Sequence, residues 1–564
     1  MNDLPGRPQP ALPVPWPARA PAAFHLLAKP AGAACNLGCK YCFYLPKEKM
    51  YPGSRLRMTD ELLELYIRQL LESHRVPRVT VAWQGGEPTL MGVDFYRRAI
   101  AYQERYRKPG MTFENTMQTN GTLLDDEWCE FFKENNFLIG ISIDGPRELH
   151  DIHRVDKAGR PTFDRVMRGL RLLQKHGVEY NVLVTVNRVT GDYPREIYRF
   201  LRDEVGTDWI QFIPVVERMN PYGVNLVQMG DRVSARSVRP EQFGRFLIQV
   251  FDEWVYNDVG QVFVQTFEAT LRNWMRLPSG MCVFDPTCGY GLAMEHNGDL
   301  YACDHFVESD YFLGNIRETH MIEMISSDQQ YKFGRDKFDR LPQACLECPV
   351  LFACHGECPK NRFIETPDGD PGLNYLCAGF KHFFHHADFA MKLMAGLIRR
   401  GRDAREVMPI LARAFAGVQR NDSCPCGSGR RYKHCHGGGT PVEPVSPPVV
   451  PAASDAASDP LAAARDAIRT GAVERAAAIV EQAALIRRRL LHWARVSFRK
   501  LLSDKPTRLE AIVTLQAVLE LIKQQAVAAQ QDEPFGDITI RATIPAERIT
   551  LAGAAQEDSI TVAA

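Results

Sequence analysis

The chain has 564 residues, and its 68 Lys and Arg residues balance its 68 Asp and Glu residues, so the formal net charge is zero. This length exceeds what one hydrophobic core supports, and about two to four domains are expected. The balanced charge gives no reason to expect nucleic acid or an anionic membrane as the main partner. No apolar run reaches the roughly 18 residues of a membrane-spanning helix. We therefore expect a cytoplasmic protein that binds neither nucleic acid nor membrane.

Residues 1–23 are rich in Pro and Ala and lack the continuous apolar stretch of a signal peptide, so we expect a flexible leader. From residue 24, β-rich segments alternate with segments of helical period such as TDELLELYIRQLLESH, residues 59–74. The alternation predicts an α/β fold with a partial (β/α)6 barrel. In such folds the functional groups gather at the carboxyl ends of the strands. The predicted strands are FHLLAKP (24–30), VTVAWQGG (79–86), TFENTMQTNG (112–121), FLIGISIDG (137–145), YNVLVTVN (180–187) and WIQFIPVV (209–216).

Composition then divides the chain. The segment after the α/β core is rich in cysteines and turns, which suits a small domain held by metal. A Pro/Ala/Ser linker and an Ala- and Arg-rich helical segment follow further on. The expected divisions are the α/β core (24–260), the cysteine-rich domain (275–400), a compact Cys/His motif (420–437), the linker (438–460), a mostly helical extension (461–532) and a tail that is weakly β-prone or disordered (533–564).

Fifteen cysteines in a protein expected in a reducing compartment are thiols or metal ligands rather than disulfides. Cys129 lies apart on a predicted helix, where a packed thiol is expected. The other fourteen fall in three groups, and isolated core thiols would not cluster in this way.

The first group is CNLGCKYCFY, with Cys35, Cys39 and Cys42 in a C-x3-C-x2-C pattern after the first predicted strand. A zinc site would need a fourth ligand, such as His25 or a distant residue. Three thiolates instead suit a [4Fe–4S] cluster with one open iron. The pattern, with Tyr41 before its last cysteine, resembles that of the radical SAM superfamily. That resemblance implies S-adenosylmethionine as cofactor and a 5′-deoxyadenosyl radical as the reactive species.

The segment QGGEP, at the end of the second predicted strand, also fits the superfamily pattern. The resemblance implies that Gly85, Gly86 and Glu87 hold the methionine amino group by backbone and carboxylate, with glycines where the backbone must come close. It further implies cofactor contacts from Ser142 and Arg154. Val216 would line the adenine. The alternatives for these three residues are a strand-end cap, a solvated charge and a core side chain.

The second group has eight cysteines, enough for two four-thiolate sites, either zinc or iron–sulfur. Behind a radical SAM core it resembles the SPASM extension, and residues 24–400 resemble the anaerobic sulfatase-maturating enzymes. The shared features include YACDHF, FLGNI, the four-cysteine core CLECPVLFACHGEC and LNYLCAGFKHFF. The resemblance implies two fully ligated auxiliary [4Fe–4S] clusters that transfer electrons. One would be held by Cys282, Cys288, Cys303 and Cys358, and the other by Cys345, Cys348, Cys354 and Cys377.

Asp304 follows Cys303 directly. The resemblance implies that a cysteine or serine on an unfolded sulfatase segment is oxidised to Cα-formylglycine. The radical would take a hydrogen from Cβ, a base would take the thiol or hydroxyl proton, and an electron would pass to an auxiliary cluster. Asp304 matches the family's proposed base. A carboxylate shielded from water beside an anionic cluster should have a raised pKa.

The third group, NDSCPCGSGRRYKHCHG, resembles the SEC-C motif. Its three thiolates and one imidazole form a closed tetrahedral set for a structural zinc ion. The ligands would be Cys424, Cys426, Cys435 and His436.

The leading hypothesis is therefore a radical SAM oxidoreductase of the sulfatase-maturating type. Its expected partners are an unfolded sulfatase or another protein or peptide substrate, and an external electron donor such as flavodoxin or ferredoxin. Two alternatives remain open. One is a SPASM-type maturase that modifies another ribosomal peptide, and the other is a zinc-binding interaction scaffold without catalysis. Cysteine and serine substrates are not distinguished.

Overall fold

The computed structural model describes residues 11–438, apart from 14 and 221–225, and residues 486, 490, 495–502, 514–515, 517–518, 521–522, 527–531 and 537–543. The chain divides into two compact units, Met1–Val445 and Ser446–Ala564. The expected linker at 438–460 and the start of the helical extension lie outside the described residues, except Gly438. Within the described part, no helix has the length and apolarity needed to cross a membrane.

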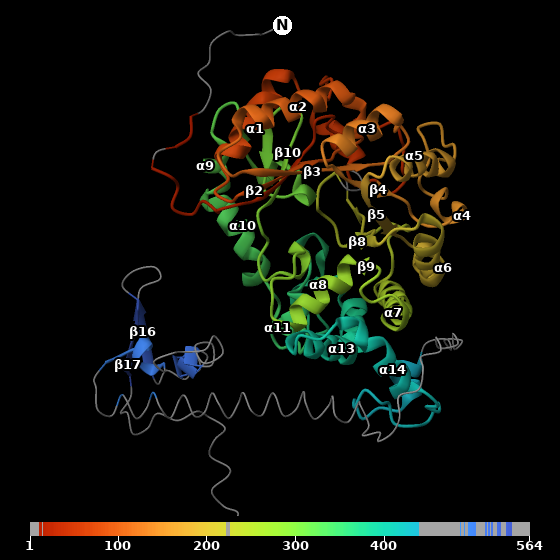
Figure 1. Ribbon diagram of the computed structural model, residues 1–564, viewed down its shortest axis with the longest axis vertical. Helices are drawn as coiled ribbons and strands as arrows, with labels where there is room; N and C mark the ends of the chain where they lie inside the picture. Colours follow the sequence, from red (N-terminus) through yellow and green to blue (C-terminus); the bar gives the residue numbers. More distant parts are fainter. Residues whose placement is uncertain are drawn as a thin grey trace, which may run out of the picture. The chain divides into compact units, whose positions relative to one another are not determined.

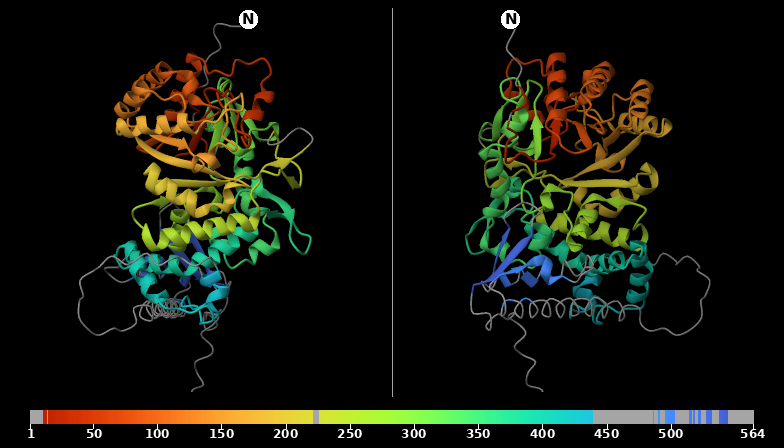
Figure 2. Two further views of the ribbon diagram at one scale, coloured as in Figure 1. Left: turned by 90° about the vertical axis from the view of Figure 1, so that its right-hand side faces the viewer. Right: turned by 60° about the vertical axis from the view of Figure 1, so that its left-hand side comes forward.

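The first unit is built on one ten-stranded sheet (Figure 1). Six strands pair in parallel and in chain order, so the predicted α/β class is confirmed. The helices that follow them run round the periphery of the sheet in chain order (Figures 1 and 2). The parallel strands are β1 (His25–Ala28), β2 (Arg78–Trp83), β3 (Thr112–Thr119), β4 (Leu138–Ser142), β5 (Glu179–Val186) and β6 (Trp209–Pro214).

The helices between these strands follow the amphipathic periods of the sequence. In α1 (Asp60–Glu72) the Thr59 side chain caps the first turn by accepting from the amide of Leu62, and the apolar face is buried. In α3 (Asp126–Glu134) the predicted packed thiol, Cys129, is fully buried. The other helices around the core are α2 (Val93–Tyr106), α4 (Arg147–His150), α5 (Phe163–Lys175), α6 (Pro194–Arg199), α7 (Pro240–Asn257) and α8 (Gln265–Trp274).

The cysteine-rich segment extends the same sheet. Strand β10 (Gly291–Met294) pairs in parallel with β1, in the register His25 to Gly291 and Ala28 to Met294. Strands β11 (Asp299–Tyr301) and β12 (Phe312–Asn315) continue it in antiparallel, and β9 (Phe263–Val264) closes the other edge beside β6. The strand before the first cysteine group therefore lies next to strands of the second group.

A long helix, α13 (Cys377–Arg399), packs against α7 through small residues. A Cβ added at Gly379 would lie 2.1 Å from the carbonyl oxygen of Pro240, so only glycine permits this approach. Around the contact, Phe267 stacks on Phe383, and Phe251 meets both rings edge-to-face. The helix thus joins the α/β core firmly to the cysteine-rich domain.

Part of the segment predicted as a leader contacts the core. The guanidinium of Arg75 lies 3.8 Å from the ring centroid of Trp16, and Arg19 pairs with Asp328 on α10 (Asp328–Asp339). The amide of Arg75 also donates to the carbonyl of Ala22. A cation–π contact and a backbone hydrogen bond hold this segment on the core, although its composition resembles that of a linker.

The second unit contains a three-stranded antiparallel sheet of β15 (Val496–Ser497), β17 (Ile538–Ala542) and β16 (Val527–Gln531). The helical pattern predicted for 461–532 is therefore wrong at 496–497 and at 527–531. Val527 and Ile540 are buried in a small apolar core with Leu521, and this tertiary packing overrides the helical propensity of the Ala-rich segment.

Candidate active site

A cavity of about 230 Å³ lies at the carboxyl ends of the parallel strands. Its lining includes all three thiols of the first group, which lie on the loop after β1. Residues from β4, β6 and the cysteine-rich domain are also part of it. His25 does not line it. The predicted site residues that do are Cys35, Cys39, Cys42, Tyr41, Gly85, Gly86, Ser142, Arg154, Val216 and Asp304.

The glycines of QGGEP pack closely against the cysteine loop, and their expected contact with the cofactor stays a prediction. A Cβ at Gly86 would lie 2.1 Å from the carbonyl oxygen of Ala34, and the amide of Gly86 donates to the carbonyl of Gly32 at 2.8 Å. Gly85 has a φ of +135°, which other residues rarely adopt. The glycines therefore let this turn press against the loop that carries the cysteines.

Glu87 is fully buried and does not line the cavity. Its carboxylate accepts hydrogen bonds from the amide and hydroxyl of Thr89, from the hydroxyl of Thr119 and from the amide of Asn120. Four protein donors thus fix the orientation of the Glu87 carboxylate, and its contact with a cofactor amino group stays a prediction. Glu87 ties the turn after β2 to the end of β3.

Asp144 organises one wall of the cavity, and the sequence analysis did not single it out. Its carboxylate accepts hydrogen bonds from the phenol of Tyr41 and from the amide and hydroxyl of Thr185, and it pairs with Arg154 at 3.0 Å. Burial by itself would raise the pKa of Asp144. The charge of Arg154 and these hydrogen-bond donors outweigh burial and hold the pKa below its usual value, so the carboxylate stays ionised. Its position in the strand-end segment SIDGP was the available signal.

Arg154 is only 6% exposed, which excludes the alternative of a solvated surface charge. Val216 is buried and also faces the cavity. Ser142 accepts a hydrogen bond from the amide of Gln118 at 3.0 Å.

Asp304 enters the cavity from the segment after β11 and forms an ion pair with Lys29, which follows β1. Lys29 is completely buried, and its ammonium lies 4.1 Å from the ring centroid of Tyr44. Burial raises the pKa of Asp304, but the charge of Lys29 more than offsets it and holds the pKa below its usual value. The expectation of a raised pKa concerns the protein with its anionic cluster bound and stays a prediction, while the buried cation Lys29, which sequence reasoning did not foresee, acts in the opposite direction.

The eight thiols of the cysteine-rich domain are free, and their mutual electrostatic effects link them in two groups. Burial, followed by the charge of Cys358 and that of Cys282, raises the pKa of Cys303 well above its usual value. Burial and the charge of Cys282 likewise raise the pKa of Cys288. Lys337, fully buried on α10, donates to the carbonyls of Cys282, Val283 (2.9 Å) and Asp285 (2.6 Å), which fixes the loop that carries the first of these thiols.

The second group comprises Cys345, Cys348, Cys354 and Cys377. Burial, followed by the charge of Cys377, raises the pKa of Cys354 to about 12 and that of Cys345 to about 11. Burial and the charge of Cys348 in turn raise the pKa of Cys377. The electrostatic neighbours are thus the members of the two predicted four-thiolate sets. Neighbouring thiols that disfavour one another's ionisation are suited to a bound cation, which stabilises the thiolate form.

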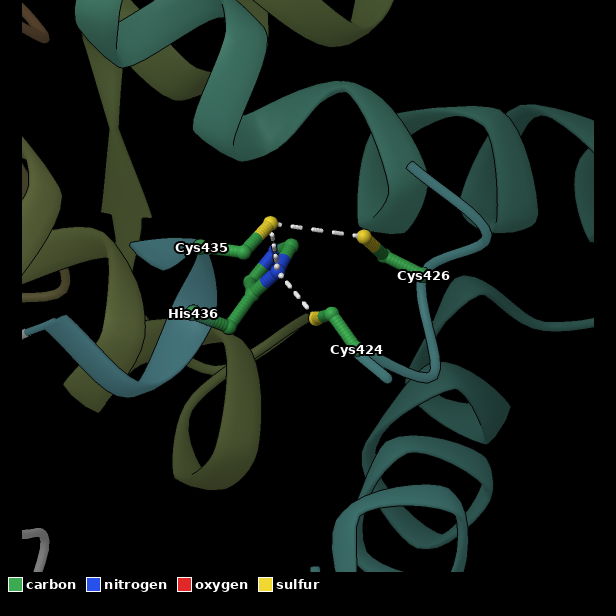
Figure 3. Close-up of side chains that lie close together, drawn as sticks. All are labelled: Cys424, Cys426, Cys435 and His436. Atoms are coloured by element: carbon green, nitrogen blue, oxygen red, sulfur yellow. Dashed lines mark hydrogen bonds between the residues drawn. The ribbon is translucent and has the colours of Figure 1, made fainter. Parts of the chain in front are cut away.

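The Cys/His motif forms a compact quartet (Figure 3). The ligand atoms of Cys424, Cys426, Cys435 and His436 all lie within 4.8 Å of one another. The His436 Nδ1 atom is 3.3 Å from the sulfurs of Cys424 and Cys435, while Nε2 lies 3.1 Å from the carbonyl oxygen of His386 on α13. This arrangement suits a tetrahedral zinc ion with an oriented imidazole.

Family models match four segments of the chain. Residues 30–201 match the radical SAM superfamily, and 286–349 match an iron–sulfur cluster-binding domain, SPASM. Residues 420–438 match the SEC-C motif. Residues 465–543 match the segregation and condensation protein ScpA, a likeness that the sequence analysis did not anticipate.

Relatives that match about two thirds of this chain decide the family. A serine-type anaerobic sulfatase-maturating enzyme of Bacteroides thetaiotaomicron is 47% identical over 377 residues, which cover 66% of this chain and 91% of the relative. The chain belongs to the anaerobic sulfatase-maturating enzymes. A cysteine-type enzyme of Clostridium perfringens in this family is 33% identical, and the match covers 64% of this chain and 95% of the relative. A solved structure described as native anSMEcpe with bound AdoMet and Cp18Cys peptide has a TM-score of 0.59 and 31% identity, covering 66% of this chain and 99% of that one.

The site fits the cofactors of a radical SAM enzyme in this family. Three thiols, a ring of polar groups and two glycines line one cavity, and two further sets of four thiols lie in the SPASM domain. Cys35, Cys39 and Cys42 would hold the first [4Fe–4S] cluster beside S-adenosylmethionine, and the two SPASM sets would hold one auxiliary cluster each. With four thiolates each, neither auxiliary cluster would have an open ligand position, so electron transfer is the chemistry it would supply.

Proposed function

We propose that this chain oxidises a cysteine or serine residue of an unfolded sulfatase segment to Cα-formylglycine. The observation that carries the proposal is the meeting of Asp304, from the SPASM domain, with Cys35, Cys39 and Cys42 in one cavity. A base beside the place where a radical would be made is what the conversion of a hydroxyl or thiol to an aldehyde requires.

The protein groups divide the work. When bound, S-adenosylmethionine and the adjacent cluster supply the radical that removes a hydrogen from Cβ of the substrate residue. Asp304 accepts the hydroxyl or thiol proton, and Lys29 fixes the direction of its carboxylate. Arg154 and Tyr41, both fixed by Asp144, present a polar wall to the cofactor. A flavodoxin or ferredoxin is the proposed external electron donor.

The relatives include both substrate types. The identity with the serine-type relative, 47%, exceeds that with the cysteine-type relative, 33%. This difference favours serine as the preferred residue of this chain's substrate.

The test uses the reconstituted full chain with reductant and paired peptides that differ only in cysteine or serine. Mass spectrometry of wild type should show the aldehyde, whereas Asp304→Asn should still form 5′-deoxyadenosine and lose most of the aldehyde. Asp310→Asn, an exposed aspartate in the same segment, is the matched control. Full aldehyde formation by Asp304→Asn would refute the role of the base. A cross-linked or epimerised product would favour the other type of maturase, and a protein that holds zinc but no iron would favour the scaffold.

A further inference from the structure

The segment between Cys354 and Cys358 joins the two predicted four-thiolate sets of the SPASM domain. Cys354 ends α12 (Leu351–Cys354) and belongs to the second set, whereas Cys358 belongs to the first. Three residues, 355–357, separate them. The conformation of this segment therefore determines how two auxiliary clusters held by these sets would lie relative to each other.

All three residues of the segment 355–357 have left-handed backbone angles. The φ values are +47° at His355, +70° at Gly356 and +52° at Glu357. Such angles are unfavourable for histidine and glutamate, and they persist only where surrounding groups hold them. The shape of the segment is thus imposed by contacts with other parts of the chain.

The side chain of Arg362 contacts all three of these residues. Its guanidinium donates to the backbone carbonyls of His355 and Gly356 at 2.8 Å and to that of Glu357 at 3.1 Å. A further hydrogen bond goes to the carbonyl of Lys337 on α10. Arginine offers a planar fork of five N–H donors, whereas the three donors of a lysine sit on one atom and are too few for these four carbonyls. Arg362 therefore holds the whole segment against α10.

Asn374 lies opposite Arg362 in a two-stranded hairpin and holds the same segment by a second route. Its side-chain amide donates to the buried carboxylate of Glu357 at 2.6 Å. Its side-chain oxygen accepts a hydrogen bond at 2.7 Å from the backbone amide of Leu376, which directly precedes Cys377. The strands of the hairpin are β13 (Arg362–Glu365) and β14 (Pro371–Asn374). The hairpin thus links ligands of both sets.

Arg362 is also a cation that acts on both thiol sets. Burial raises the pKa of Cys288, in the first set, and of Cys345, in the second, and the charge of Arg362 opposes this rise in each. Lys337 likewise opposes the rise at Cys282 and at Cys288, both in the first set. A positive charge that favours a thiolate also favours the reduced, more negative form of a bound cluster. One half-buried guanidinium therefore lies within electrostatic reach of both predicted cluster sites.

We propose that Arg362 is a positioning residue for electron transfer, which fixes the segment between the two auxiliary clusters and raises the reduction potential of both. This inference rests on the proposed function, and it names a residue that controls the electron path of that reaction. By its four hydrogen bonds Arg362 keeps the two ligands at a constant separation. By its charge it stabilises the reduced form on either side of the segment.

The first experiment measures the potentials of the auxiliary clusters in the reconstituted full chain. Cys35→Ala, Cys39→Ala and Cys42→Ala together form the background, so that only the auxiliary clusters give electron paramagnetic resonance signals. In Arg362→Gln, the equilibrium constant for reducing each cluster should fall about tenfold, a shift of ~59 mV for one electron. Arg362→Lys keeps the charge and should retain the background potentials. Arg340→Gln, at an exposed arginine that follows α10, is the matched control.

An unchanged potential at either cluster in Arg362→Gln would overturn the shared effect of the charge. Should Arg362→Gln lose its iron, Arg362→Lys is the deciding variant, and it should hold about eight irons per chain at the background potentials. Loss of iron from Arg362→Lys as well, or a shift in it as large as that expected for Arg362→Gln, would refute the electrostatic role.

The second experiment follows the segment by hydrogen exchange and mass spectrometry, without S-adenosylmethionine or peptide. Amide exchange across residues 351–362 should be about tenfold faster in Arg362→Lys than in wild type, because the fork that holds the carbonyls is lost. Arg340→Lys should match wild type. Equal exchange in Arg362→Lys and wild type would overturn the positioning role. Neither experiment measures the aldehyde, so failure of the proposed reaction is a separate result.

Discussion

Lys29 and Asp304 form a buried ion pair between the first strand of the radical SAM core and the segment after β11 of the SPASM domain. The lysine is completely buried, and the aspartate side chain is 14% exposed. The pair therefore joins the two domains at the point where the substrate residue is proposed to react.

Lys29→Met should uncouple the two halves of the reaction. Loss of the cation leaves the Asp304 carboxylate without its partner in a buried site, which costs on the order of 3–5 kcal/mol in comparable pairs. We expect 5′-deoxyadenosine to form while the yield of aldehyde per deoxyadenosine falls at least tenfold, with partial recovery in Lys29→Arg. Equal yields in Lys29→Met and wild type would contradict this role.

Gly86→Ala should disrupt the first cluster site. The new Cβ would lie 2.1 Å from the Ala34 carbonyl, so the cysteine loop must move. We expect a loss of about four irons per chain and of S-adenosylmethionine cleavage. In Gly291→Ala, the added Cβ meets no atom within 4 Å, and both quantities should stay normal. Normal iron content in Gly86→Ala would show that the loop tolerates displacement.

The sequence predicted features that depend on neighbouring residues and missed those that depend on contacts between residues far apart in the chain. The six strands and the cysteine groups were predictable because alternation and spacing are local properties. The partner of Gly86 lies some fifty residues earlier in the loop around Ala34, and the partner of Lys29 lies in another domain. A lysine after a strand is usually solvated, and an aspartate in SIDGP resembles a turn residue. Contacts between such distant residues depend on the tertiary fold and leave no local pattern.

Lys337→Met should lower the reduction potential of the auxiliary cluster expected at Cys282, Cys288, Cys303 and Cys358. The buried ammonium lies among the carbonyls of that ligand loop, and positive charge near a cluster stabilises its reduced form. Potentiometry followed by electron paramagnetic resonance measures the shift. Lys332→Met removes the same charge from an exposed position of α10 and should leave the potential unchanged. Equal potentials in the two variants would exclude the effect.

His150 predicts a specific acid sensitivity. Burial, with the charge of Arg154, lowers its pKa to about 3, so it is neutral in the folded state. An unfolded histidine titrates near 6.5. Between these values the unfolded state binds more protons, and stability falls as the pH falls. The loss should reach about 2 kcal/mol at pH 5. Thermal unfolding at pH 7 and pH 5 should show a smaller loss in His150→Gln than in wild type, and parallel losses would contradict the assignment.

Removing the zinc site should leave the iron sites intact. Cys435→Ser takes one ligand from the SEC-C quartet, which shares no residue with the three iron–sulfur sets. Elemental analysis should show zinc lost and about twelve irons per chain retained. The contact of His436 with the carbonyl of His386 should loosen, and proteolysis after Gly417 should speed up. A parallel loss of iron would show that the motif supports the clusters.

The pairing of β1 with β10 has a consequence for biosynthesis. The strand that precedes the first cysteine loop gains its second neighbour only when residues 291–294 have left the ribosome. Until then its backbone is paired on one side alone, and Lys29 lacks Asp304. Iron insertion at the amino-terminal cysteines is thus expected to follow synthesis of the SPASM domain. A chain truncated after residue 260 should load its cluster poorly, although it contains every ligand of that cluster.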